Sequence, residues 1–190
     1  MKFSSIVAGF FTLMTVARAS VIQEQEPNND VNTAQQIPVA AFTLGYNPII
    51  ANSATLPWVT IDGTGDGTND FYSFVVPDSG MIASIFDIDH ITHPYDAYVT
   101  LYDSNGNYLA HNDDQSPADP GSHTALDSYL TYTFNAPGVY VVKVGRFPSN
   151  QPVPTGATYQ LHISLGYTEA QLRAAYGMGD PHFKVRHSRL

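Results

Sequence analysis

The chain has 190 residues, of which 43% are hydrophobic and none is cysteine, and its formal net charge is −9 at pH 7. This length allows one domain with a sizeable core, and the lack of cysteine excludes disulfide bonds as a source of stability. Fifteen aspartates and glutamates lie between residues 20 and 142, a stretch that contains neither lysine nor arginine. Because nucleic-acid-binding proteins need basic patches, this distribution argues against a nucleic-acid partner. Such carboxylates either face water, where they aid solubility, or gather around cations.

The first 19 residues have the pattern of a secretory signal peptide. Lys2 supplies a positive start, residues 3–16 are mostly apolar, and Ala17 and Ala19 fit the small-x-small rule for cleavage. A membrane anchor is the alternative, but the apolar run is too short to span a bilayer comfortably. We therefore expect a secreted, extracellular protein whose mature chain starts at Ser20 and has no membrane span.

Residues 20–38 form a polar, acidic lead-in to the main domain. Within it, Glu24, Glu26, Asn28, Asn29 and Asp30 place five side chains with oxygen donors inside seven residues. The side chain of Asp30 is also able to cap a short helical turn over residues 31–36, which the proline at position 38 would end. The alternative is a disordered N-terminus of the mature chain.

The loop at residues 62–70 carries three aspartates among glycine, threonine and asparagine. Asp62, Asp66 and Asp70 are spaced four residues apart, and the loop runs directly into the aromatic strand expected at residues 71–76. Glycine allows the tight backbone that aims several oxygens at one point, and calcium binds about six to eight oxygen ligands. The loop therefore predicts a Ca²⁺ site on the rim of the domain, with a plain acidic surface as the alternative.

From residue 39 to residue 166 short strands alternate with turn residues, and helical periodicity is almost absent. The expected strands are 40–46, 57–61, 71–76, 81–86, 97–102, 108–111, 128–134, 139–145 and 157–165. The turn at residues 77–80 and the Asn105–Gly106 pair are hairpin signals. This pattern predicts an all-β domain, an antiparallel β-sandwich or jelly roll of eight to nine strands.

A second acidic group lies further along the chain and is the weaker metal candidate. Asp87 and Asp89 are two residues apart on an expected strand end, so their side chains point to one face. The full candidate set is Asp87, Asp89, Asp113, Asp114 and Asp127. The alternative is that these aspartates cap ordinary hairpin turns.

After the last expected strand, residues 167–190 contain a short helix and a basic tail. Thr168 and Gln171 fit a capping box, and Gly177 is a natural C-terminal cap, so a helix is expected over residues 168–177.

Several motifs together resemble the bacterial pre-peptidase C-terminal domain. They lie, in family order, at residues 24–30, 65–74, 86–89, 101–107, 112–114, 126–134 and 138–145. The resemblance implies a β-sandwich that is appended to secreted proteases and other extracellular proteins as a non-catalytic accessory. In collagen-binding members of the family, calcium bridges the N-terminal segment to the loop before an aromatic strand. Carried over to this chain, the implied ligands are Glu24, Glu26, Asn28, Asn29, Asp66 and Asp70, with Asp62 versus Asp66 left open.

A smaller resemblance lies at Gly179–Phe183, which is similar to the opening of a von Willebrand factor type D domain. That domain would continue far beyond Leu190, so either the chain is truncated or the match is due to chance.

The function expected from these observations is that of a secreted, non-enzymatic, calcium-binding accessory domain for extracellular adhesion or targeting. Its partner would be extracellular matrix, polysaccharide or a cell-surface protein. The nucleophile elbow, catalytic cysteine and phosphate-binding glycine motifs are absent from the sequence. The alternatives are a fragment of a secreted hydrolase and a structural module of a larger multidomain protein.

Overall fold

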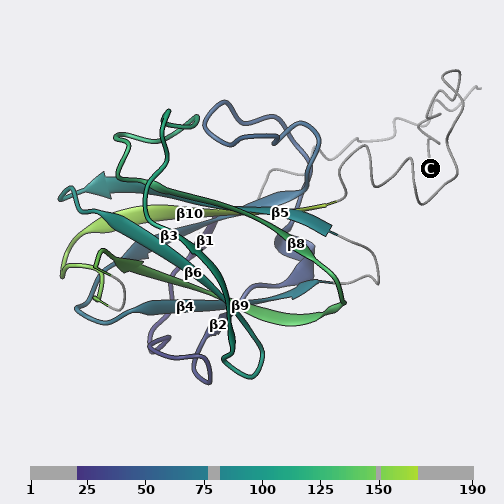
Figure 1. Cartoon of the computed structure of the whole chain (residues 1–190), viewed down its shortest axis with the longest axis horizontal. Helices are drawn as coiled ribbons and strands as arrows, with labels where there is room; N and C mark the ends of the chain where they lie inside the picture. The colour runs from purple at the N-terminus through teal and green to yellow at the C-terminus, as the bar shows by residue number, and fades with distance from the viewer. Residues whose placement is uncertain (1–20, 77–81, 149–150, 167–190) are drawn as a thin grey trace, which may run out of the picture.

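The computed structural model describes residues 21–76, 82–148 and 151–166, and its strands form two five-stranded sheets (Figure 1). The expected signal peptide, the turn at residues 77–80, the helix at residues 168–177 and the basic tail lie outside the described residues. Within the described ranges, no helix has the length and apolar character that a membrane crossing requires.

Each sheet has one short N-terminal strand at its edge. The first sheet has the order β1 (Val21–Gln23), β3 (Trp58–Thr64), β10 (Thr158–Gly166), β5 (Ile82–Thr92), β8 (Ser128–Phe134). The second sheet has the order β2 (Gln35–Gln36), β4 (Asp70–Val76), β9 (Gly138–Arg146), β6 (Ala97–Asp103), β7 (Tyr108–Asn112). The strand pairs β1–β3 and β2–β4 are parallel, and the remaining pairs are antiparallel.

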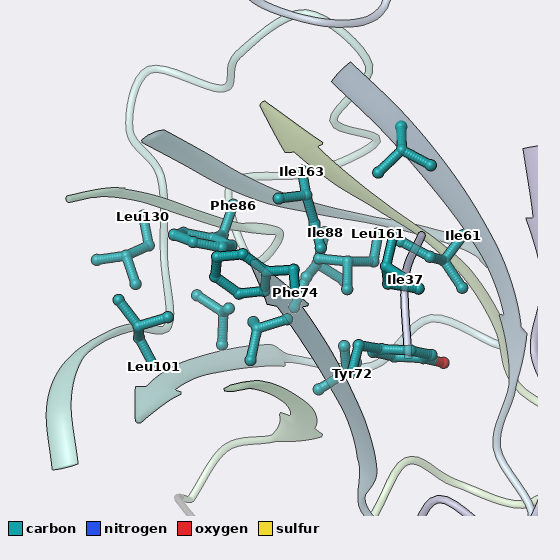
Figure 2. Close-up of a cluster of buried hydrophobic side chains, with 14 of the residues drawn as sticks. Ile37, Ile61, Tyr72, Phe74, Phe86, Ile88, Leu101, Leu130, Leu161 and Ile163 are labelled. Carbon is teal, nitrogen blue, oxygen red and sulfur yellow. The ribbon is translucent and has the colours of Figure 1, made fainter. Parts of the chain in front are cut away.

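The core lies between the two sheets, because alternate residues of each strand face inward. In β4 the residues Tyr72, Phe74 and Val76 are buried, while the residues between them are only half buried. The ring of Phe74 lies 5.4 Å from the ring of Phe86 and 6.0 Å from that of Phe134, which belong to the other sheet (Figure 2). The all-β prediction is therefore confirmed, and the two facing sheets are consistent with a β-sandwich. The strand order does not establish the jelly-roll alternative.

Two sequence predictions in the N-terminal third are wrong. Residues 40–46 form no strand: Val39–Ala41 is a short 3₁₀ turn, η1, and Thr43 makes an isolated bridge to Trp58. The two alanines at positions 40 and 41 have little preference for a strand, and the N–H of Ala41 instead donates to the carbonyl of Pro38.

The helical turn expected over residues 31–36 stops early. The carboxylate of Asp30 caps it as predicted, accepting the N–H groups of Asn32 at 2.7 Å and Thr33 at 3.0 Å. Residues 35–36 then pair with β4 as β2, because a sheet edge offers their backbone groups partners that an isolated turn does not.

The lead-in crosses from one sheet to the other. β1 lies on the edge of the first sheet and β2 on the edge of the second, so the segment between them passes over one side of the sandwich (Figure 1). Residues 21–36 therefore form part of both sheets, and the alternative of a disordered N-terminus does not hold for them.

Candidate metal centre

Three carboxylates converge where the lead-in passes the start of β4. Glu24 follows β1, and its N–H donates to the carbonyl of Asp62 at 3.0 Å, which continues the pairing of β1 with β3. Asp70 is the first residue of β4. One carboxylate oxygen from each of Glu24, Glu26 and Asp70 lies within 4.8 Å of the other two. Across the described part of the chain, this is the one group of three acidic or histidine side chains so close together.

Glu24 is held in place by donors from three strands. Its Oε1 accepts hydrogen bonds from the hydroxyl groups of Tyr72, at 2.6 Å, and Tyr159, at 3.1 Å. Its Oε2 accepts the N–H of Thr64 at 2.6 Å. The two tyrosines belong to opposite sheets, so this single side chain ties the lead-in to both of them.

Asn28 connects the two glutamates and is itself fully buried. Its N–H donates to Glu26 Oε2 at 2.8 Å, and its side-chain amide donates to Glu24 Oε1 at 3.1 Å. Its carbonyl accepts the N–H of Phe71 at 2.9 Å, which fixes the lead-in against β4. The side-chain oxygen of Asn28 is buried and has no hydrogen-bond partner.

Asp70 is fully buried, and only one of its two oxygens is satisfied. Oδ2 accepts the hydroxyl of Tyr159 at 2.6 Å, whereas Oδ1 is buried without a hydrogen-bond partner. Burial, followed by the negative charge of Glu24, raises the pKa of Asp70 to about 8. A buried carboxylate beside other negative charges is stabilised when it takes up a proton or a cation.

Asp66 and Asn29 lie at the exposed rim of the same site. Asp66 Oδ1 accepts the N–H of Thr68 at 2.7 Å, and the Thr68 hydroxyl lies 2.6 Å from that oxygen and 3.0 Å from Asn29 Oδ1. These bonds to Thr68 lower the pKa of Asp66. The negative charge of Asp66 acts on both Glu26 and Asp70, so the loop brings a fourth carboxylate to the group.

Glycine is required in this loop at two positions. Gly67 has a φ of +99°, and a Cβ added to Gly65 would lie 2.4 Å from the carbonyl oxygen of Pro154. Any other residue would strain the turn that carries Asp66.

Asp62 faces a different direction. Its Oδ1 accepts the side-chain amide of Gln160 at 2.9 Å, and its Oδ2 accepts that of Gln23 at 3.1 Å. Both glutamines are paired with Asp62 in the sheet, so the side chain of Asp62 makes its hydrogen bonds on the outer face of the first sheet. Of the two aspartates that the sequence left open, the geometry therefore favours Asp66.

The second predicted set is divided among three places. Asp87 and Asp89 are buried on the outer face of β5, away from the core. Asp127 shares a hydrogen bond with Nδ1 of His90 and accepts the N–H of His123 at 2.7 Å. The remaining two residues, Asp113 and Asp114, follow β7 and act on Asp96, whose pKa is raised by burial and by their charges.

The sequence missed the residues that support the first site. Tyr159 comes 89 residues after Asp70 and joins it only through the fold, so no spacing could reveal the contact. Tyr72 lies in the aromatic strand that the sequence predicts, but its neighbour Phe71 is aromatic too, so the pattern does not show which of the two faces inward. The resulting donor set consists of oxygen atoms and carries negative charge, which hard divalent cations prefer.

Comparison with known proteins gives one family match. Residues 68–146 match the model of the bacterial pre-peptidase C-terminal domain, which spans the chain from the acidic loop through β9. No curated protein matches the chain at a significant level. The resemblance of Gly179–Phe183 to a von Willebrand factor type D domain lies outside the described residues and gains no support.

Several solved structures share part of the fold at low similarity. One is the pre-peptidase C-terminal domain of a collagenase from Bacillus anthracis, with 22% identity over 55% of this chain and 87% of that one, and a TM-score of 0.38. Another is PliG, a periplasmic inhibitor of g-type lysozyme from Aeromonas hydrophila, with 12% identity over 77% of this chain and 99% of that one, and a TM-score of 0.36. At these scores the likeness carries no conclusion about function.

Proposed function

We propose that the protein is a secreted, non-enzymatic accessory domain that binds Ca²⁺ through its N-terminal segment and serves extracellular adhesion or targeting. The observation that carries the proposal is the convergence of Glu24, Glu26 and Asp70 at a place where two buried oxygens lack partners. The family match at residues 68–146 supports the accessory role, because pre-peptidase C-terminal domains accompany secreted proteases without acting as their catalytic part.

The donors at this site fit calcium. Glu24, Glu26, Asp66 and Asp70 offer carboxylate oxygens, and Asn28 offers a buried amide oxygen without a partner. Calcium accepts about six to eight such oxygens in flexible geometry, with carbonyls and water completing the set. Bound there, the ion would supply the positive charge that the buried carboxylates lack and would join the lead-in to the loop before β4.

The experiment is thermal unfolding of the purified protein with calcium and with a chelator. At a calcium concentration of about ten times the dissociation constant, linkage gives about 1.4 kcal/mol of stabilisation. For a domain of this size that corresponds to a rise of about 3–6 °C in Tm. We expect the rise in the wild type and its loss in Asp70→Asn, which removes one carboxylate and keeps the side-chain shape.

Asp62→Asn is the matched control, because Asp62 comes from the same segment but is held by two glutamines. It should keep the calcium-dependent rise. A wild-type protein whose Tm does not respond to calcium would leave the carboxylates as acidic surface, and the calcium part of the proposal would fall.

The adhesion part has its own test. Calcium-loaded protein should be retained on one class of immobilised material: extracellular matrix protein, polysaccharide or cell surface. Reduced retention of the Asp70→Asn protein on the same material would mean that the lead-in orders the binding face. Hydrolysis of any of these materials by the purified protein would favour the alternative of a hydrolase fragment.

A further inference from the structure

A second buried polar cluster lies on the outer face of the first sheet, away from the calcium candidate. In β5 the side chains of Phe86 and Ile88 enter the core, so Asp87 and Asp89 point the opposite way. His162 of β10 is aligned with Asp87 and points to the same face. These three outward-facing side chains are each only 1% exposed.

Two loops cover this face. Figure 1 shows the loops that precede β3 and β8, residues 44–57 and 113–127, on the side of the first sheet that is turned away from the second. They meet over Asp89: a Cβ added to Gly121 would lie 2.4 Å from Asp89 Oδ2 and 2.6 Å from the carbonyl oxygen of Ile49. Gly121 has a φ of +106°, so glycine is needed there both for the turn and for the close approach.

His162 is oriented as a metal-ligating histidine is. Its Nδ1 lies 2.8 Å from the hydroxyl of Thr60, and such a contact on one ring nitrogen fixes the other. The Nε2 atom is buried without a hydrogen bond and lies 3.3 Å from Asp89 Oδ2, which is an ion pair when the imidazole is protonated. Two ligands of one tetrahedral ion at about 2.0–2.1 Å would be separated by about 3.3–3.4 Å, which is close to this distance.

The carboxylates around His162 lack compensating charge. Both oxygens of Asp87, both oxygens of Asp89 and Oδ2 of Asp119 are buried without hydrogen-bond partners. In the described ranges, lysine and arginine occur only as Lys143 and Arg146, and both belong to β9 of the other sheet. An unpaired buried carboxylate costs several kcal/mol, so Asp87 and Asp89, both buried beside one imidazole and the partly buried Asp119, favour a further cation.

We propose that this cluster binds one divalent cation of the zinc class, Zn²⁺ or Mn²⁺, through His162 Nε2 and the carboxylates of Asp87, Asp89 and Asp119. A mixed set of imidazole and carboxylate donors suits these ions better than it suits calcium. Asp119 is partly buried, and its negative charge acts on both Asp87 and Asp89. No three of these donors lie as close together as those of the first site, so binding of an ion requires their side chains to move toward it.

The proposal revises the second set predicted from the sequence. Asp87 and Asp89 remain, while His162 and Asp119 join them through the fold. Asp127 is engaged by His90, and the two aspartates that follow β7 act on Asp96 instead. The site does not depend on calcium binding at the lead-in, since the two share no residue.

The test uses the Asp70→Asn protein, in which the calcium candidate is impaired, so that the two proposals fail or succeed separately. The protein is loaded with Zn²⁺, passed through a desalting column and assayed for bound metal by elemental mass spectrometry. We expect about one zinc per chain, and a loss of affinity of at least about tenfold in Asp87→Asn and in His162→Gln. Asp114→Asn, an acid from the same loop, should retain the metal.

Two results would overturn the proposal. One is equal zinc retention by the parent, Asp87→Asn and His162→Gln. The other is a parent that retains neither zinc nor manganese. Circular dichroism checks that each variant folds, and Mn²⁺ electron paramagnetic resonance on the parent tests the site without any mutation in the cluster itself.

Discussion

At the scale of single residues, the first site depends on tyrosine hydroxyl groups. Tyr72 and Tyr159 come from opposite sheets, and their hydroxyl groups lie 2.6 Å apart. Tyr72 donates to Glu24, and Tyr159 donates to Asp70 Oδ2 at 2.6 Å while lying 3.1 Å from Glu24. The hydroxyl oxygen of Tyr72 points away from the apolar cluster, as its red atom in Figure 2 shows. The hydroxyl groups of these two tyrosines therefore position the carboxylates of Glu24 and Asp70.

Removing one of these hydroxyls should weaken the fold. Tyr159→Phe leaves the ring in the core but takes the donor from Asp70, and an unsatisfied buried acceptor costs about 1–3 kcal/mol. The loss should be measurable by urea unfolding in the presence of calcium. A phenylalanine variant as stable as the wild type would show that water or another donor replaces the hydroxyl.

Asp70 should make the calcium-free protein less stable as the pH rises. Its folded pKa of about 8 lies above the value of about 3.9 in an unfolded chain. The proton therefore contributes stability that is complete below the unfolded pKa and is lost as the pH rises through about 8.

The free energy of unfolding, measured with chelator from pH 6 to pH 10, should fall in the wild type relative to Asp70→Asn. The difference between the two proteins should change with a slope of about 1.4 kcal/mol per pH unit below pH 8 and level off above it, where the carboxyl is ionised in both the folded and the unfolded state. Parallel curves for the two proteins would contradict the assignment of this titration to Asp70.

At the scale of secondary structure elements, the long strands were predictable and the short edge strands were not. β10 alternates apolar and polar residues over nearly its whole length, and β4 is rich in aromatic and β-branched residues; both are local signals for a strand. β1 and β2 have only three and two residues, and their parallel pairing depends on distant parts of the chain. No local pattern in the sequence contains that information.

β5 shows a second limit of sequence reasoning. It was expected to end at residue 86 but continues to Thr92 through Asp87 and Asp89. Aspartates are rare in strands and common in turns, so the pattern indicated a strand end. The covering loops, which bury these side chains, are a property of the tertiary structure.

The cross-sheet aromatic contacts give a prediction for the core. Phe74 packs against Phe86 and Phe134 of the other sheet, so Phe74→Ala should cost about 3–5 kcal/mol. Phe71, the neighbouring ring in β4, is half buried on the outer face and serves as the control with a smaller expected loss. Equal losses for the two variants in urea unfolding would contradict the assignment of the core to the space between the sheets.

At the scale of the whole molecule, the uneven distribution of charge explains how much of the site was predictable. With fifteen acids and no lysine or arginine between residues 20 and 142, the sequence alone left two readings, a solvated acidic surface or carboxylates that gather around cations. It also supplied Glu24, Glu26 and Asp70, which the fold brings together. It could not separate Asp62 from Asp66, because that difference depends on which glutamines lie beside Asp62 in the sheet.

The crossing of the lead-in from β1 to β2 has a consequence for how the protein behaves when its N-terminal segment detaches. The same segment covers the outer edge of β3 in one sheet and the outer edge of β4 in the other. Its release would expose two rows of unpaired backbone groups on the same side of the molecule, and such edges pair readily with strands of other chains. Removal of calcium would then favour self-association, so bound calcium would suppress aggregation in addition to stabilising the fold.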